Sequence, residues 1–231
     1  MKIFTYMRNA FFIVSVFISG CLFNACDTET IEPSELYHEY YPVTIGHYNI
    51  YNVDSVYYND FTGEIESYNY QVKEVIESEF IDADDYPSLR LERYFRATES
   101  DEWLIKNVWK SRLNYLKALK TEENVTYIKL SFPPEENKTW DGNAFNSYPA
   151  LQYKYQDVHK AFSKDGFIAD STITVIQNNF QTLISEDYKV EVYAKHIGLV
   201  YKKFVELVKE VDGTITRGVD YSYLLIESGV E

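Results

Sequence analysis

The sequence is short of glycine and histidine, and it lacks the motifs that common catalytic sites require. Among its 231 residues are nine glycines and four histidines. Phosphate-binding and dinucleotide-binding glycine patterns are absent, as are the GxSxG and SxxK patterns of serine nucleophiles. The histidines (His38, His47, His159 and His196) show no metal-ligand spacing. We therefore predict no catalytic residue, no metal site and no cofactor.

Basic residues are also scarce relative to acidic ones. The chain has 22 Lys and Arg against 36 Asp and Glu, a formal net charge of −14. Nucleic-acid phosphates and anionic membrane surfaces would repel such a chain. We expect no nucleic-acid partner, and any link to a membrane must come from a source other than a basic patch.

Long apolar runs are missing too, apart from one short run near the N-terminus. Residues 10–23 (AFFIVSVFISGCLF) are almost wholly apolar and follow a start that carries Lys2, Arg8 and no acid. A membrane-spanning helix needs roughly 20 such residues. A basic start, an apolar centre and small residues at the exit are typical of a secretory signal. This favours a signal peptide over residues 1–25, with a buried core helix as the alternative.

The two cysteines of the chain both lie at the end of this segment. Ile18-Ser19-Gly20-Cys21 resembles the bacterial lipobox closely, and Phe23-Asn24-Ala25-Cys26 resembles it more loosely. After Cys26 the chain turns at once to DTETIEPSE, and an acidic stretch past the cysteine resembles lipoproteins of Bacteroidota. We predict lipidation, of the palmitate kind, at Cys26, with Cys21 as the alternative, followed by an acidic tether over residues 26–39. A disulfide between the two is disfavoured by their spacing within a cleavable segment.

Residues 40–231 predict one β-rich domain. Apolar and polar residues alternate with period two in several segments, which is the pattern of half-buried strands. Examples are 68–80, 89–97, 128–132 (with Lys129 and Ser131 on the polar side) and 219–225. The phase changes between Ile50 and Tyr51, which predicts a bulge. Segment 199–210 fits a helix or a strand, and its β-branched residues favour the strand.

Turn residues separate these runs, for example at 59–63, 82–85, 164–166 and 212–213. The Asp-Gly pairs among them are strong hairpin signals. We therefore expect a mainly β fold of about ten strands in a largely antiparallel meander. It would form a twisted partial barrel or a sandwich, with few or no helices outside the signal peptide.

Two features invite a functional interpretation that the residues leave open. The carboxylates of Asp82, Asp84 and Asp85 could hold calcium, but their loop lacks the Gly and Glu of an EF-hand, and a solvated hairpin loop is favoured. With 36 acids some close pair is inevitable, so an acidic pair of the glycoside-hydrolase kind carries no information. An enzyme is the minority interpretation.

The chain is rich in aromatic residues, with 22 Tyr, 14 Phe and 3 Trp. Most are expected to fill a β core and to pair across strands. In the loop KTWDGN, Trp140 is expected to be exposed or half exposed among turn residues. Trp140, Asp141 and Asn143 are therefore the candidate ligand contacts, with anchoring of the loop as the alternative.

Four segments together resemble a family of Bacteroidota cell-envelope lipoproteins over nearly the whole mature chain: YYPVTIGHYNIYNVDSV, KTWDGNAFN, DSTITVIQNN and EVYAKHIGLVYKKF. The resemblance implies export and anchoring, and no activity or catalytic residue. Gly46 and Gly198 match the family's glycines and suit a close backbone approach or a bend. His196 stands where a small residue is expected, which puts a tight turn there in doubt. Asp-Ser motifs of the phylum's O-glycosylation type make Ser55 and Ser171 candidate glycan sites.

Together these observations predict a non-catalytic protein held to the outer membrane by lipid, facing the periplasm or, slightly favoured, the cell surface. Its partner would be a glycan, a lipid or an envelope protein. One alternative is a periplasmic carrier of lipid or lipoprotein with a concave apolar cleft. A hydrolase with an unrecognised acidic pair is a further alternative.

Overall fold

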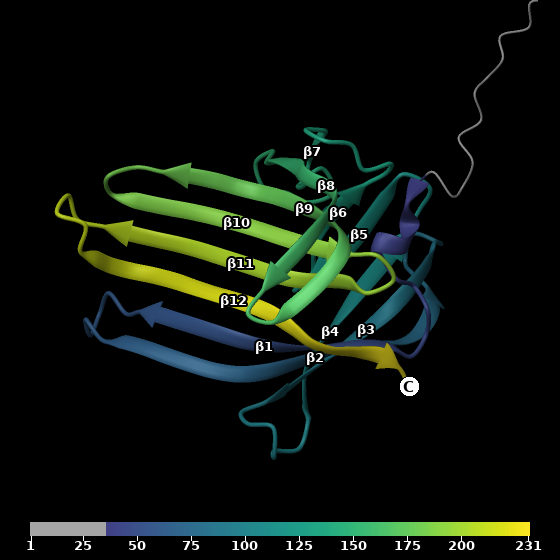
Figure 1. Cartoon of the computed structure of the whole chain (residues 1–231), viewed down its shortest axis with the longest axis horizontal. Helices are drawn as coiled ribbons and strands as arrows, with labels where there is room; N and C mark the ends of the chain where they lie inside the picture. Colours follow the sequence, from purple (N-terminus) through teal and green to yellow (C-terminus); the bar gives the residue numbers. More distant parts are fainter. Residues whose placement is uncertain (1–35) are drawn as a thin grey trace, which may run out of the picture. The chain divides into compact units, whose positions relative to one another are not determined.

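The computed structural model describes residues 36–231, which fold as one antiparallel β-sheet (Figure 1). A short 3-10 helix, η2 (His38–Tyr40), precedes twelve strands. The strands are β1 (His47–Tyr58), β2 (Ile65–Ile81), β3 (Pro87–Arg96), β4 (Leu104–Leu113), β5 (Lys117–Glu122), β6 (Val125–Ser131), β7 (Thr139–Asp141), β8 (Gln152–Lys164), β9 (Phe167–Gln181), β10 (Ser185–Ala194), β11 (Gly198–Lys209) and β12 (Ile215–Val230). No helix in this part of the chain is long and apolar enough to cross a membrane.

The strand order is β6-β5-β4-β3-β2-β1-β12-β11-β10-β9-β8-β7, and the sheet curls into a nearly closed barrel. Its two ends, β6 and β7, meet through hydrogen bonds from Ile128 N to Gly142 O and from Trp140 Nε1 to Ile128 O, each 2.9 Å long. These bonds give the end strands partners, so the expectation of a mainly β, antiparallel barrel is confirmed. Two strands more than expected are present, and the sheet curls on itself instead of splitting into a sandwich.

Local sequence explains most of the hairpins. Asp165 and Gly166, with φ of 47° and 90°, form the two-residue turn between β8 and β9, where Asp-Gly predicts such a turn. The turns at 59–63, 82–85 and 212–213 lie between neighbouring strands as expected, and segment 199–210 lies almost wholly in β11. The pairing of β1 with β12 shifts register between Ile50 and Tyr51, which confirms the predicted bulge.

The β10–β11 connection corrects one expectation. His196 adopts the left-handed region with φ of 63°, so the tight turn forms without a glycine there. Its backbone N donates to Glu39 O at 2.6 Å, which holds the residue in this conformation. Gly198 follows with φ of 85°, and a Cβ on it would lie 3.0 Å from Pro42, so the expected close approach is present.

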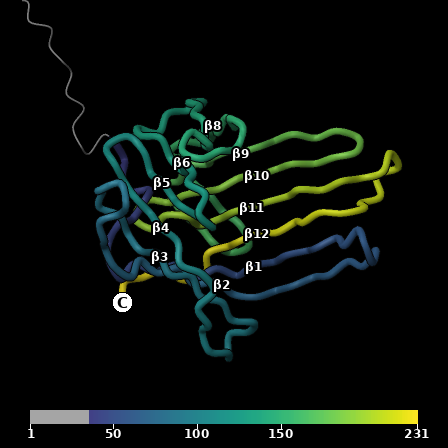
Figure 2. The backbone as a smooth tube through the Cα atoms, turned by 180° about the vertical axis from the view of Figure 1, so that it is seen from behind, coloured from purple at the N-terminus to yellow at the C-terminus, as the bar shows by residue number. Residues whose placement is uncertain are grey.

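Six strands continue beyond the barrel as an open sheet, called the blade here. It comprises residues 55–68, 178–189 and 204–221, which lie in three long hairpins (Figures 1 and 2). β2 pairs with β1 from Ile65 onward but with β3 only from Gln71. β9 likewise pairs with β8 only up to Ile176. The barrel therefore opens where the blade begins.

The main core cluster lies at the other end of the barrel. Tyr40, the last residue of η2, and Tyr41, which follows it, pack there with residues of β5 to β10, among them Leu130, Tyr155 and Ile173. Leu36 is fully buried as well. The last residues of the expected tether (36–39) therefore pack against the domain, and together with Tyr40 and Tyr41 they close this end of the barrel.

Candidate functional site

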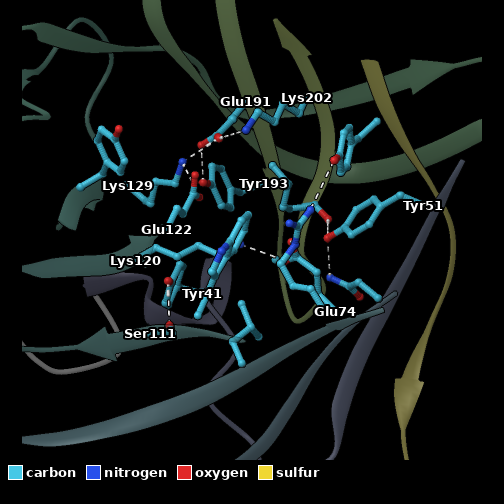
Figure 3. A pocket seen from close by; sticks show the side chains of 18 of the residues that line it. Tyr41, Tyr51, Glu74, Ser111, Lys120, Glu122, Lys129, Glu191, Tyr193 and Lys202 are labelled. Atoms are coloured by element: carbon cyan, nitrogen blue, oxygen red, sulfur yellow. Dashed lines mark hydrogen bonds and ion pairs between the residues drawn. The ribbon is translucent and has the colours of Figure 1, made fainter. Parts of the chain in front are cut away.

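The barrel contains a cavity of about 450 Å³. It reaches from Tyr41 and the Ile197–Gly198 turn at the packed end to Tyr223 and the β5–β6 turn where the blade begins. Its wall is aromatic and charged: Trp109 and seven tyrosines share it with four cations and four carboxylates. Figure 3 labels several of these residues, among them Tyr41, Lys129 and Glu191. The cations are Arg93, Lys120, Lys129 and Lys202, and the carboxylates are Glu74, Glu122, Glu123 and Glu191.

One ion cluster is built around Glu74 on β2. Its Oε1 accepts from Arg93 Nε and its Oε2 from Lys120 Nζ, both at 2.9 Å. The guanidinium of Arg93 stacks 3.7 Å above the centre of the Trp109 ring, and the Lys120 ammonium lies 4.8 Å from the same centre. Each carboxylate oxygen of Glu74 therefore accepts a hydrogen bond from a cation, and both cations also contact the Trp109 ring.

A second cluster joins strands that are far apart in the sheet order. Lys129 Nζ on β6 donates to Glu191 Oε1 on β10 at 2.8 Å and pairs with Glu122 on β5 at 3.1 Å. The Tyr193 hydroxyl donates to the other oxygen of Glu191 at 2.6 Å. Lys202 Nζ lies 3.6 Å from Glu191 Oε1. Figure 3 shows these side chains converging on one side of the cavity.

The neighbouring charges keep these groups ionised despite burial. Burial alone would raise the pKa of Glu122, but Lys129, Lys202 and Lys120 outweigh it and hold the pKa well below its usual range. Burial alone would lower the pKa of Lys129, and Glu122 and Glu191 raise it well above the usual range instead. The cavity wall therefore carries full charges at neutral pH.

Two polar groups on the wall have incomplete hydrogen bonding. Lys202 Nζ has no acceptor within hydrogen-bond distance among the described residues, since its 3.6 Å contact with Glu191 is too long. Asn49 Nδ2 donates to Ile197 O at 2.9 Å, but the buried Oδ1 of Asn49 has no partner within this part of the chain. Buried polar groups are rarely left unpaired, so Asn49 Oδ1 is open to a donor from a bound molecule, and Lys202 Nζ in the cavity wall is open to an acceptor.

The candidate contacts of the KTWDGN loop lie in the core. Trp140 is only 9% exposed and donates to Ile128 O, so the expectation that it is exposed or half exposed is wrong. Its ring lies 4.5 Å from that of Tyr155. Asp141 Oδ1 accepts from the backbone N of Asn143 and of Leu151, and Asn143 Nδ2 donates to Pro149 O. These contacts are those of loop anchoring, the alternative weighed for this segment.

Other predicted sites lie apart from the cavity. Asp82 Oδ2 accepts from Lys110 Nζ and from the Ser88 hydroxyl, so a lysine occupies the position that the calcium alternative gave to a metal ion. No group of three or more His, Cys, Asp or Glu in residues 36–231 is placed to hold a metal. Ser55 is half-buried on β1, and the half-buried Ser171 bonds to the Tyr40 hydroxyl at 2.8 Å. Cys21 and Cys26 lie outside the described residues.

Sequence reasoning missed the charged residues of the wall. Glu74 has the same parity as Tyr70, Val72 and Ile76, so the alternation itself placed an acid on the inner face of β2. Arg93 likewise shares the phase of Leu91 and Phe95. A charged residue at a position where the alternation places inward-facing apolar residues predicts a polar interior, and this pattern could have identified both residues. Lys129 gave no such signal, because it alternates with Ile128 and Leu130, which are buried too.

No protein-family model matches the chain, and the curated proteins contain no match. Among solved structures, the chain is similar to a Bacteroides fragilis protein that is described as exported and as having a YmcC-like fold. The identity is 11% and the TM-score is 0.43, over 81% of this chain and 97% of that one.

Proposed function

We propose that the barrel binds a small polar molecule in its interior cavity. The observation that carries the proposal is the cavity of about 450 Å³, whose wall combines aromatic rings with ionised groups held in place by ion pairs. Ligand pockets typically measure roughly 300–1,000 Å³ and pair apolar surface with a few fixed polar groups. A wall held rigid before binding loses little conformational entropy when a ligand enters.

The composition of the wall favours a polar ligand over an acyl chain. A carrier of lipid would need an apolar cleft, whereas this cavity presents four cations and four carboxylates. Filling it with hydrocarbon would take the water from groups such as Lys202 without replacing its hydrogen bonds, which is costly. We therefore place glycans and other polar small molecules ahead of lipid as the ligand, and binding ahead of catalysis.

The setting that we propose for this binding domain is the cell envelope. The motivation is the sequence of the first 26 residues, with its basic start, apolar run and Cys26. Several acyl chains on one cysteine would hold the domain firmly to the outer membrane. The acidic stretch after Cys26 favours display on the cell surface.

The binding proposal is tested by mass spectrometry of small molecules released from the full chain after gentle purification. A matched pair of variants locates the ligand. Val125 lines the cavity, so Val125→Trp fills part of it, whereas Val108 is 45% exposed on β4 and Val108→Trp leaves the cavity open. We expect a polar molecule to be retained by the wild type and by Val108→Trp, and lost from Val125→Trp. Equal retention by all three proteins, or none by the wild type, would contradict the proposal.

A further inference from the structure

The buried part of the cavity wall carries more positive than negative charge, although the chain as a whole is acidic. The whole chain has a net charge of −14, yet four cations face only three buried carboxylates across the cavity: Glu74, Glu122 and Glu191. The fourth carboxylate, Glu123, is on the exposed β5–β6 turn, and its Oε1 accepts from Trp109 Nε1 at 3.0 Å. The buried part of the wall therefore has one cation more than it has carboxylates.

Lys202 is the cation that the protein leaves incompletely paired. Arg93, Lys120 and Lys129 each donate to a carboxylate at 2.8–2.9 Å, while Lys202 Nζ comes no closer than 3.6 Å to Glu191. Its side chain is 17% exposed and lines the cavity, so the ammonium faces the space that a ligand would enter. An ammonium without a full set of acceptors can donate to an anionic oxygen placed beside it, and such charge-assisted hydrogen bonds are stronger than neutral ones.

The charge of Lys202 persists in this position. Burial alone would lower its pKa, but the Tyr221 hydroxyl and the carboxylates of Glu122 and Glu191 outweigh burial and raise the pKa above its usual value. The register of the sheet places Tyr223 directly opposite Lys202, and the Lys202 ammonium lies 5.7 Å from the Tyr221 ring centre. An anion at Lys202 would therefore lie beside Tyr223 and beside Tyr221, whose ring already stacks on Phe204 at 4.8 Å, and a ring-shaped group could pack against this aromatic wall.

A second unpaired group lies at the other end of the cavity. Asn49 is more than nine-tenths buried, lines the cavity, and its Oδ1 has no hydrogen-bond partner among residues 36–231. It lies at Gly198, four residues before Lys202 on β11, a spacing of about 13 Å at the usual rise of a strand. With a hydrogen-bond acceptor at one end and a cation at the other, the cavity would bind an elongated ligand in one orientation.

We propose that the cavity binds an elongated organic anion that contains a ring. Its anionic group contacts Lys202 beside Tyr221 and Tyr223, and a hydroxyl or amine at its opposite end donates to Asn49 Oδ1. The inference rests on the proposed binding function and names the ligand class for the same cavity. Carboxylate, phosphate and sulfonate share the chemistry that Lys202 recognises, since each offers several anionic oxygens to an ammonium.

Two fluorescent probes that differ in their charged group test this assignment. Anilinonaphthalene sulfonate carries an anionic group on its rings, and phenylnaphthylamine has the same ring skeleton without it. Titrations of the full chain with each probe compare the wild type with Lys202→Met. We expect the variant to lose about tenfold or more in affinity for the sulfonate, the loss typical of a charged hydrogen bond. Its affinity for the neutral probe should change less than twofold.

Two further variants serve as controls. Lys203 is the next residue of β11 and pairs with Asp220 on the opposite face, so Lys203→Met should leave both affinities unchanged. Lys202→Arg keeps the cation and should retain sulfonate binding. Near-ultraviolet circular dichroism checks that each variant is folded.

The outcomes separate the inference from the proposed function. If both probes lose affinity equally with Lys202→Met, or if sulfonate binding is unchanged, the assignment of Lys202 is wrong while cavity binding stands. If the wild type binds neither probe, or if Val125→Trp leaves the binding of both probes unchanged, the proposed function fails. This inference then fails with it.

Discussion

Lys129 and Glu191 form a buried ion pair, 2.8 Å between Nζ and Oε1, that joins β6 at one end of the sheet order to β10 near the other end. Their side chains are 5% and 2% exposed. The pair therefore crosses the cavity wall where the barrel closes, and it fixes the position of β6 against strands with which β6 makes no ladder.

Removing one partner of this pair should destabilise the protein strongly. Lys129→Met leaves the carboxylates of Glu191 and Glu122 without their nearest cation, and breaking a buried pair typically costs about 3–5 kcal/mol. Adding Glu191→Gln removes one of the orphaned charges, so the double variant should be more stable than Lys129→Met alone. Urea unfolding of the wild type, both single variants and the double variant measures the coupling. Additive effects of the two substitutions would show that the pair is not coupled.

Gly46 should be far more sensitive to substitution than Gly63, although both have positive φ. Gly46 (φ 83°) lies against the C-terminus, and a Cβ on it would be 2.3 Å from Glu231 O; Gly63 (φ 74°) has nothing within 4 Å. Gly63→Ala should cost about 1–2 kcal/mol for the left-handed conformation alone. Gly46→Ala should cost more, because the backbone at Glu231 must move as well. Urea unfolding compares the two, and equal losses would contradict a steric role for Gly46.

Most of the local structure could be predicted from the sequence, but the closure of the barrel could not. The bulge at Ile50 and the Asp165-Gly166 turn follow from phase and from turn chemistry, which act over a few residues. Barrel closure depends on the pairing of Ile128 with Gly142, which no local pattern encodes. For the same reason Lys129 looked exposed: both faces of β6 are buried once β7 and its loop lie beside it.

The functional site was predictable in part. Glu74 and Arg93 interrupt apolar alternations at inward positions, a readable sign of a polar interior. Trp140 was misplaced because turn residues surround it in sequence, although its ring packs with Tyr155 and its indole nitrogen binds Ile128 O. Which of the cations would remain unpaired, as Lys202 does, depends on distances of a few tenths of an ångström across the barrel, and these are set by the closed sheet alone.

Stability should decline as the pH falls below neutral. Burial lowers the pKa of His47. At Glu74 and Glu122, neighbouring cations outweigh burial and hold the pKa below the usual value for glutamate. In each case the unfolded chain binds protons at a higher pH than the folded chain does, so acid favours unfolding. The loss begins near the unfolded pKa of histidine, about 6.5, and steepens below that of glutamate, about 4.3. We expect Tm to fall by roughly 5 °C or more between pH 7 and pH 4.

Thermal unfolding at constant ionic strength across this range measures the effect. The double variant Lys129→Met, Glu191→Gln should have a shallower acid decline than the wild type, because it lacks one of the ionised buried carboxylates. Glu206→Gln is the control, since the Glu206 side chain is 62% exposed. A Tm that stays constant down to pH 4 would show that these buried groups do not govern the stability.

The anchor can be tested apart from the fold, because Cys21 and Cys26 precede the domain in the sequence. With a net charge of −14, the chain has little electrostatic attraction to an anionic membrane surface, so membrane attachment should depend wholly on acyl chains. Expressed in a host that processes lipoproteins, Cys26→Ala should move from the membrane to the soluble fraction and lose palmitate label, while Cys21→Ala should keep both. Release by Cys21→Ala alone would reassign the lipid to Cys21. If neither substitution releases the protein or removes its palmitate label, the lipoprotein hypothesis is wrong.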